Sequence, residues 1–311
     1  MAQQTNSGPN TMEIVREIAR RVASVKIPVG KMKSHQRLPG DRRSIHRGEG
    51  DDFDGHELYV PGDDPRTIDW NATAMTGGQQ VLVALFKEES HVRSTILCDV
   101  SKTMSFGSSR TTKRLLAAEL AACAVQSLAV THDPVSLVTY SKTGVERRVK
   151  SGPSGSMMLP VLLNILDSRQ SERPETGSSL ANGLALLPRS PAIVFVISDF
   201  LNTTDADWEA LQRAGRRHKV LALYVQDLRE RELPRTGFLP VLYTVQDGSG
   251  QERDIWVTKS SARQYAAKFQ AHQAKILARL KHCRASTLIV STEEGQEATT
   301  RVLNFLQAPT L

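Results

Sequence analysis

The chain has 311 residues, of which 40% are hydrophobic and 23% are charged, and its formal net charge at pH 7 is +7. This is the composition of an ordinary globular protein, long enough for a real core in one large domain or two smaller ones. Because no run of 18 apolar residues occurs and residues 1–10 are polar, we expect neither a membrane span nor a secretory signal.

The charge is distributed unevenly along the first seventy residues. Residues 1–50 contain ten Lys or Arg against four acids, whereas residues 51–70 contain seven acids against one Arg. The basic segment is compatible with binding nucleic acid or an acidic membrane surface, but a solvated arm is the favoured interpretation. No aromatic residues are interleaved with the basic ones, so nucleic-acid binding is not expected.

The N-terminal part is predicted to consist of a helix followed by an arm. Thr11 is a suitable N-cap, and apolar residues recur at helical spacing up to Val25, which predicts a helix over residues 11–25. The Gly, Pro, Arg and Ser of residues 26–50 favour an extended segment. We therefore treat 1–44 as a partly disordered helix and basic arm, and 45–90 as a segment packed on the core.

From residue 94 onward, apolar strands alternate with helices. This alternation predicts an α/β fold with a doubly wound, mostly parallel sheet over residues 91–311. A β-hairpin insertion is expected near 240–258, where two strand-like runs flank Asp247-Gly248-Ser249-Gly250. The predicted strands are 94–99, 135–140, 145–149, 192–199, 220–225 and 287–290, and the predicted helices are 111–131, 156–168, 178–187, 206–217, 261–282 and 294–306.

Polar residues with oxygen side chains follow two of these strands. Asp99, Ser101 and Thr103 come at the end of the first strand, and Asp199 ends the strand at 192–199. Ligands of open α/β sheets bind at the carboxyl ends of strands, so we expect the two carboxylates to converge there, with Ser178 as a further hydroxyl. Hard oxygen donors suit Mg²⁺, with Mn²⁺ or Ca²⁺ as alternatives. Each residue taken singly also has a structural interpretation, as a turn or helix cap.

This pattern resembles the von Willebrand factor A fold. The metal-ion-dependent adhesion site of that family uses Asp-x-Ser-x-Ser, a later Thr and a later Asp, and the matching positions here are Asp99, Ser101, Thr103, Ser178 and Asp199. Thr103 stands where Ser is usual and Ser178 where Thr is usual, and Ser179 is an alternative to Ser178. The resemblance implies a metal completed by a partner's carboxylate, and therefore protein binding and no enzymatic activity.

A longer resemblance covers about residues 45–265. The segment from Gly55 to Trp70, GHELYVPGDDPRTIDW, is similar to the signature of the bacterial domain of unknown function family 58, as is Arg231-Glu232-Leu233-Pro234. Proteins of that family are commonly associated with MoxR-type AAA+ ATPases. The resemblance implies an adaptor that works with such an ATPase on a client protein, in chaperone-like remodelling.

Four charged residues are candidates for contacting a partner: Lys102, which lies between the two hydroxyls, and Asp63, Asp64 and Arg66 of the signature segment. The alternative for the segment, which we favour, is an ion-pair network around Trp70 that holds it on the core. For Lys102 the favoured alternative is a solvated loop residue.

Two other functions compete with protein binding. Two carboxylates on Mg²⁺ also suit a metal-dependent phosphoester hydrolase, but no general base or nucleophile is evident beside them. The third function is nucleic-acid binding through the basic arm. The chain has no Gly-x-x-x-x-Gly-Lys-[Ser/Thr] sequence, so ATP hydrolysis is expected only from a partner. The three cysteines are far apart and lack metal-ligand spacing, which favours the cytoplasm.

Overall fold

The computed structural model describes residues 11–23, 45–47, 52–77, 79–87, 92–108, 111–167, 179–233, 241–246 and 252–307. The chain divides into two compact units. One is Gly40–His91, and the other combines Met1–Pro39 with Val92–Leu311. The packing of segment 45–90 on the core stays a prediction.

The smaller unit contains a three-stranded antiparallel sheet in the order β1-β3-β2. Its strands are β1 (Ile45–Arg47), β2 (Asp52–Leu58) and β3 (Leu82–Lys87). Between β2 and β3 the chain forms the short helices η2 (Pro65–Thr67) and α2 (Trp70–Met75).

The carboxylates of the signature segment bind backbone N–H groups in this unit. Asp63 accepts from Val60, Asp64 accepts from Arg66 at the start of η2, and Asp69 caps α2 and also pairs with His56. Trp70 is 66% exposed. These aspartates therefore act as turn and helix caps, since the short Asp side chain reaches nearby N–H groups easily, and the ion-pair network around Trp70 stays a prediction.

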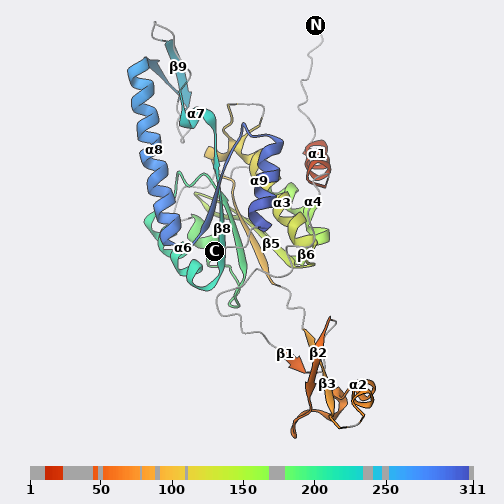
Figure 1. Cartoon of the computed structure of the whole chain (residues 1–311). Helices are drawn as coiled ribbons and strands as arrows, with labels where there is room; N and C mark the ends of the chain where they lie inside the picture. The colour runs from red at the N-terminus through yellow and green to blue at the C-terminus, as the bar shows by residue number, and fades with distance from the viewer. Residues whose placement is uncertain are drawn as a thin grey trace. The chain divides into compact units, whose positions relative to one another are not determined.

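The larger unit is built on a six-stranded sheet in the order β11-β8-β7-β4-β5-β6 (Figure 1). All neighbouring strands are parallel except the edge pair β5–β6. The mostly parallel α/β sheet is thus confirmed. The strands are β4 (Ser94–Asp99), β5 (Pro134–Ser141), β6 (Gly144–Pro153), β7 (Ile193–Ser198), β8 (Lys219–Gln226) and β11 (Ser286–Ser291).

Helices cover both faces of this sheet (Figure 1). One face packs on α1 (Thr11–Ala23), α3 (Lys113–Ala129), α4 (Ser154–Leu166) and α9 (Gln296–Gln307). The other packs on α5 (Ser179–Leu184), α6 (Asp205–Arg217) and α8 (Lys259–His282). The central strands β4, β7 and β8 are buried on both sides, which explains their nearly continuous apolar sequences.

The first helix belongs to the core of the larger unit. Val15, Ile18 and Val22 of α1 are at most 3% exposed, and Arg21 forms a 2.6 Å ion pair with Glu119 of α3. The sequence assigns α1 to a partly disordered region with the basic arm, whereas in the structure α1 is an integral layer of this unit. The proposed arm after it, residues 24–44, lies outside the described residues.

The predicted hairpin insertion is present as β9 (Val241–Gln246) and β10 (Glu252–Val257), which pair antiparallel. It separates the short helix α7 (Leu228–Arg231) from α8. In the described part of the chain, no helix combines the length and the apolar character that crossing a bilayer requires.

Candidate functional site

Three of the predicted donors lie together where β4 ends. Asp99 is the last residue of β4, and Ser101 is the N-cap of the short helix η3 (Lys102–Ser105), which contains Thr103. The Ser101 backbone N–H donates to Asp99 Oδ1 at 2.9 Å, and the Ser101 and Thr103 hydroxyl oxygens are 3.0 Å apart. The turn thus brings a carboxylate and two hydroxyls to one point at the carboxyl edge of the sheet.

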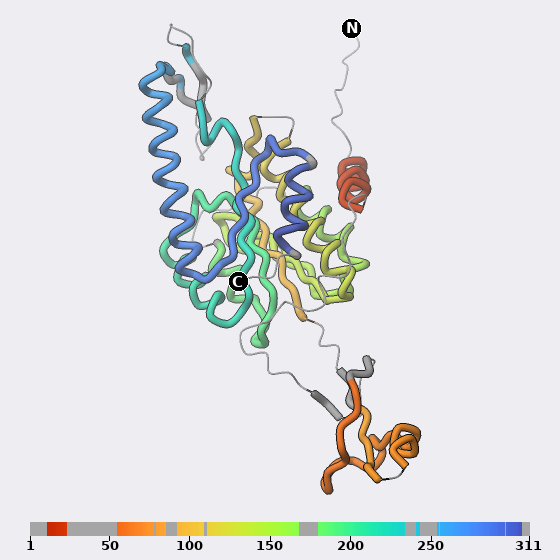
Figure 2. Tube along the Cα trace, in the orientation of Figure 1, coloured from red at the N-terminus to blue at the C-terminus, as the bar shows by residue number. Residues whose placement is uncertain are grey.

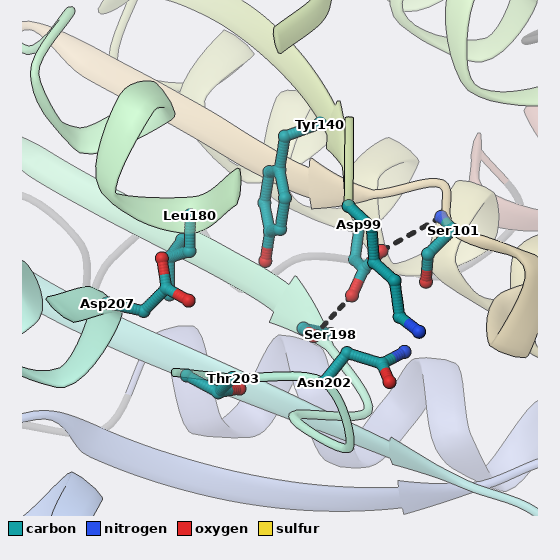
Figure 3. A pocket seen from close by; sticks show the side chains of 9 residues that line it. Asp99, Ser101, Tyr140, Leu180, Ser198, Asn202, Thr203 and Asp207 are labelled. Atoms are coloured by element: carbon teal, nitrogen blue, oxygen red, sulfur yellow. Dashed lines mark hydrogen bonds between the residues drawn. The ribbon is translucent and has the colours of Figure 1, made fainter. Parts of the chain in front are cut away.

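Asp199 follows the neighbouring strand but binds elsewhere. Cys98 of β4 lies opposite Ile197 of β7, so the next positions on the two strands, Asp99 and Ser198, face the same side of the sheet. Accordingly, the Ser198 hydroxyl donates to Asp99 Oδ2 at 2.8 Å (Figure 3). The Asp199 carboxylate accepts a hydrogen bond from Lys113 at 2.7 Å instead. Sequence reasoning missed Ser198, because only the register between β4 and β7 shows that its side chain faces Asp99.

Lys113 is a buried cation at the start of α3. Its side chain is 0% exposed and lies between the carboxylates of Asp199 and Glu230, the latter on α7. Burial lowers the pKa of Lys113, but the charges of Asp199 and Glu230 outweigh this effect and raise it. Burial raises the pKa of Glu230, and Lys113 partly offsets that effect. The triad therefore joins the ends of β7 and β8 to α3.

Asp99 is a buried acid with an altered affinity for protons. Burial, followed by the negative charge of Asp199, raises its pKa to about 6, against the lowering effect of its hydrogen bonds to Ser101 and Ser198. The two carboxylates are thus close enough to influence each other. Among the described residues, no cationic side chain forms an ion pair with Asp99. At neutral pH the site therefore holds a buried negative charge that accepts hydrogen bonds from neutral donors.

A small pocket opens beside Asp99, with free space for about one water molecule. Two of its lining residues, Tyr140 and Asn202, have side-chain polar atoms that are buried and lack a hydrogen bond of normal geometry among the described residues. Unsatisfied buried groups next to a carboxylate indicate that a polar species belongs there. The other lining residues are Ser101, Lys142, Leu180, Ser198, Thr203 and Asp207 (Figure 3).

The donor set fits a hard divalent cation. Asp99, Ser101 and Thr103 offer only oxygen, and Ser198 holds the carboxylate in place. Ser178 lies outside the described residues, and the side chain of Ser179 is not described. No group of three or more His, Cys, Asp or Glu suited to a metal is found among the described residues, so a cation here depends on the hydroxyls.

The remaining candidates lie in or beside the short helices η2 and η3. Lys102 is exposed in η3, beside the two hydroxyls. Asp64 and Arg66 are exposed and Asp63 is half-buried in the smaller unit, where the two aspartates stabilise turns. Their proposed contact with a partner stays a prediction.

Comparison with known proteins gives one family and several distant relatives. The profile of the family described as "Protein of unknown function DUF58" matches residues 56–275. Uncharacterized proteins of Mycobacterium tuberculosis and Mycobacterium bovis are 27% identical over 268 residues, which is 85% of this chain and 81% of each relative.

Two solved structures are similar at lower identity. The conserved hypothetical protein BatB from Bacteroides thetaiotaomicron is 15% identical with a TM-score of 0.42, covering 69% of this chain and 98% of that one. An aerotolerance-related membrane protein from Bacteroides fragilis is 14% identical with a TM-score of 0.43, covering 68% of this chain and 98% of that one.

Proposed function

Because this chain belongs to the DUF58 family of proteins of unknown function, we propose its function from the chemistry at the end of β4. It is a protein-binding adaptor without enzymatic activity, and it engages its partner through a divalent cation. Mg²⁺ is the preferred ion, with Mn²⁺ or Ca²⁺ as alternatives. The observation that carries this proposal is the buried Asp99 carboxylate, which has hydroxyl oxygens around it and no ion pair among the described residues.

The residues proposed to hold the ion are Asp99, Ser101 and Thr103, with Ser178 as a further donor. Asp199 contributes its negative charge from the neighbouring strand while its carboxylate binds Lys113. When bound, the cation neutralises Asp99 and leaves coordination positions for oxygens of a partner's carboxylate. A von Willebrand factor A-like fold is the finer description of the parallel sheet that we propose.

We extend the proposal to a MoxR-type AAA+ ATPase as partner, with a client protein as the object of chaperone-like remodelling. This extension is supported by the similarity of Gly55–Trp70 to the family signature and by membership of the family. Cys98, Cys123 and Cys283 are buried free thiols, which suits the reducing cytoplasm that we propose as its location.

The test is capture of a purified MoxR-type ATPase by the immobilised chain, with Mg²⁺ or with EDTA. Capture is expected with wild type in Mg²⁺, and not with EDTA or with Asp99→Asn. Asp133→Asn is a matched control, because Asp133 is also buried and also accepts one backbone N–H and one hydroxyl. Capture that persists in EDTA and in Asp99→Asn contradicts the proposal.

A further inference from the structure

The pocket beside Asp99 is lined by side chains from the two strands that flank β4. These strands run side by side in the sheet (Figure 2). Asp99 is paired with Tyr140 of β5 in the parallel ladder, and Ser198 of β7 occupies the matching position on the other side. Side chains at matching positions face the same side of a sheet. Asn202, in the turn between β7 and α6, lines the pocket as well, and Figure 3 shows its amide and the Tyr140 hydroxyl directed into this space.

Most polar groups around the pocket already have partners. The Asp207 carboxylate accepts from two backbone N–H groups and a hydroxyl. The Thr203 hydroxyl donates to the carbonyl of Phe200. The Ser198 hydroxyl donates to Asp99 and accepts from the Phe200 N–H. The groups that remain without a partner therefore indicate what the pocket is built to receive.

These remaining groups are all donors. The Tyr140 hydroxyl and the Asn202 side-chain nitrogen are buried without a hydrogen bond of normal geometry to another described residue. The Lys142 ammonium, which also lines the pocket, forms no ion pair within the described ranges. Burial and the charge of Asp99 raise the pKa of Tyr140 well above its ordinary value, which the nearby Ser198 hydroxyl only partly offsets, so the phenol keeps its proton. The missing species is therefore an acceptor.

The charge of the pocket decides which acceptor fits. At neutral pH Asp99 and Asp207 contribute two formal negative charges and Lys142 one positive charge, so the lining carries −1 and repels an anion. A divalent cation at Asp99 changes this sum to +1, which attracts an anionic oxygen. The free space, about that of one water molecule, fits a single carboxylate oxygen.

We propose that Tyr140 and Asn202 recognise the partner's carboxylate by donating hydrogen bonds to one of its oxygens once a cation is bound at Asp99. Lys142 adds an attractive charge at the same pocket. The two donors thus select the partner's chemical group, a task separate from holding the cation. This inference rests on the proposed function, because the pocket without a cation repels an anion. It also fixes the order of binding, with the cation first and the carboxylate second.

The test measures Mg²⁺ binding by calorimetry and acetate binding by NMR titration, both on the full-length chain at pH 7. Acetate is the probe for a carboxylate, and acetamide is its neutral counterpart of the same shape. Wild type is expected to bind acetate only with Mg²⁺ present, and more tightly than acetamide. Tyr140→Phe removes only the hydroxyl, and it is expected to weaken acetate binding about tenfold while changing Mg²⁺ affinity less than about twofold.

Asn202→Asp separates the two ligands further. The added carboxylate is expected to tighten Mg²⁺ binding and to weaken acetate binding about tenfold or more, and a loss of folding cannot produce these opposite changes. Tyr224→Phe is the matched control, because Tyr224 is also a buried strand tyrosine, on β8, and lies outside the pocket. It is expected to leave both affinities within about twofold of wild type. Circular dichroism checks that each variant is folded.

The outcomes separate this inference from the proposed function. Wild type that binds Mg²⁺ but not acetate, or acetate binding that is equal in wild type and Tyr140→Phe, overturns the inference and leaves the cation in place. Either result is expected if the pocket holds only a water molecule. Acetate binding without Mg²⁺ also overturns it, because the stated order then fails. Absence of Mg²⁺ binding by wild type instead removes the proposed function, and this inference with it.

Discussion

Lys113 and Asp199 form a buried ion pair, with 2.7 Å between Lys113 Nζ and Asp199 Oδ2 and side chains that are 0% and 1% exposed. This pair directs Asp199, which follows β7, toward α3. Asp99, at the end of β4, faces the opposite side of the sheet with Ser198. Each carboxylate is therefore fixed by a different partner. The negative charge of one still affects the proton affinity of the other.

Replacing Lys113 with Met is expected to destabilise the protein by about 3 kcal/mol or more, because Asp199 and Glu230 then lose their shared cation while still largely buried. Urea unfolding followed by circular dichroism measures the change. Arg147→Met is the control, since the Arg147–Asp167 pair is at least 43% exposed and should contribute less than about 1 kcal/mol. Similar losses in the two variants would show that the buried triad has no special role.

Replacing Ile18 with Ala is expected to lower the free energy of unfolding by about 2–4 kcal/mol, because Ile18 of α1 is 2% exposed in the main core. Met12→Ala on the same helix is the comparison, since Met12 is 38% exposed and should change stability by about 0.5 kcal/mol or less. Equal, small effects in the two variants would mean that α1 is only loosely attached.

Much of the larger unit could be predicted because its signals are local. The strands around Asp99 and Ser198 are short apolar runs, and the turn that joins Asp99 to Ser101 and Thr103 is written in five consecutive residues. Neither feature depends on a distant part of the chain. The strand alternation and the first half of the candidate site were therefore accessible from the sequence alone.

The second half of the site depends on pairing between strands far apart in sequence. Asp199 and Ser198 are adjacent, and only the register of β7 against β4 decides which of them faces Asp99. Lys113 stands at the start of a helix, a position that normally suggests exposure, and its burial follows from two acids brought in by β7 and α7. Such pairings are tertiary and have no local signature.

The raised pKa of Asp99 predicts a specific pH dependence in metal-free protein. Because the folded-state pKa is about 6, above the usual value of 3.8, the protonated form favours folding. This stabilisation is complete below pH 4 and is lost as the pH rises through 6, by up to about 3 kcal/mol. Asp99→Asn should therefore gain stability relative to wild type between pH 4.5 and pH 7.

The measurement is urea unfolding of both proteins in EDTA across this pH range, with Asp133→Asn as the buried-carboxylate control. All other titrating groups are present in both proteins, so the difference between wild type and Asp99→Asn reports Asp99 together with its charge interaction with Asp199. A difference that does not change with pH would mean that the Asp99 pKa is close to its usual value.

Mg²⁺ is expected to raise the melting temperature of the wild type at pH 7, because a cation at Asp99 relieves the buried charge that the pH dependence reveals. At a concentration about 100 times the dissociation constant, the stabilisation is about 2.7 kcal/mol, and EDTA should reverse it. Asp99→Asn should show no Mg²⁺-dependent shift, whereas Asp133→Asn should keep the wild-type shift. An equal shift in Asp99→Asn would place the binding of Mg²⁺ elsewhere and remove the basis for a cation at the end of β4.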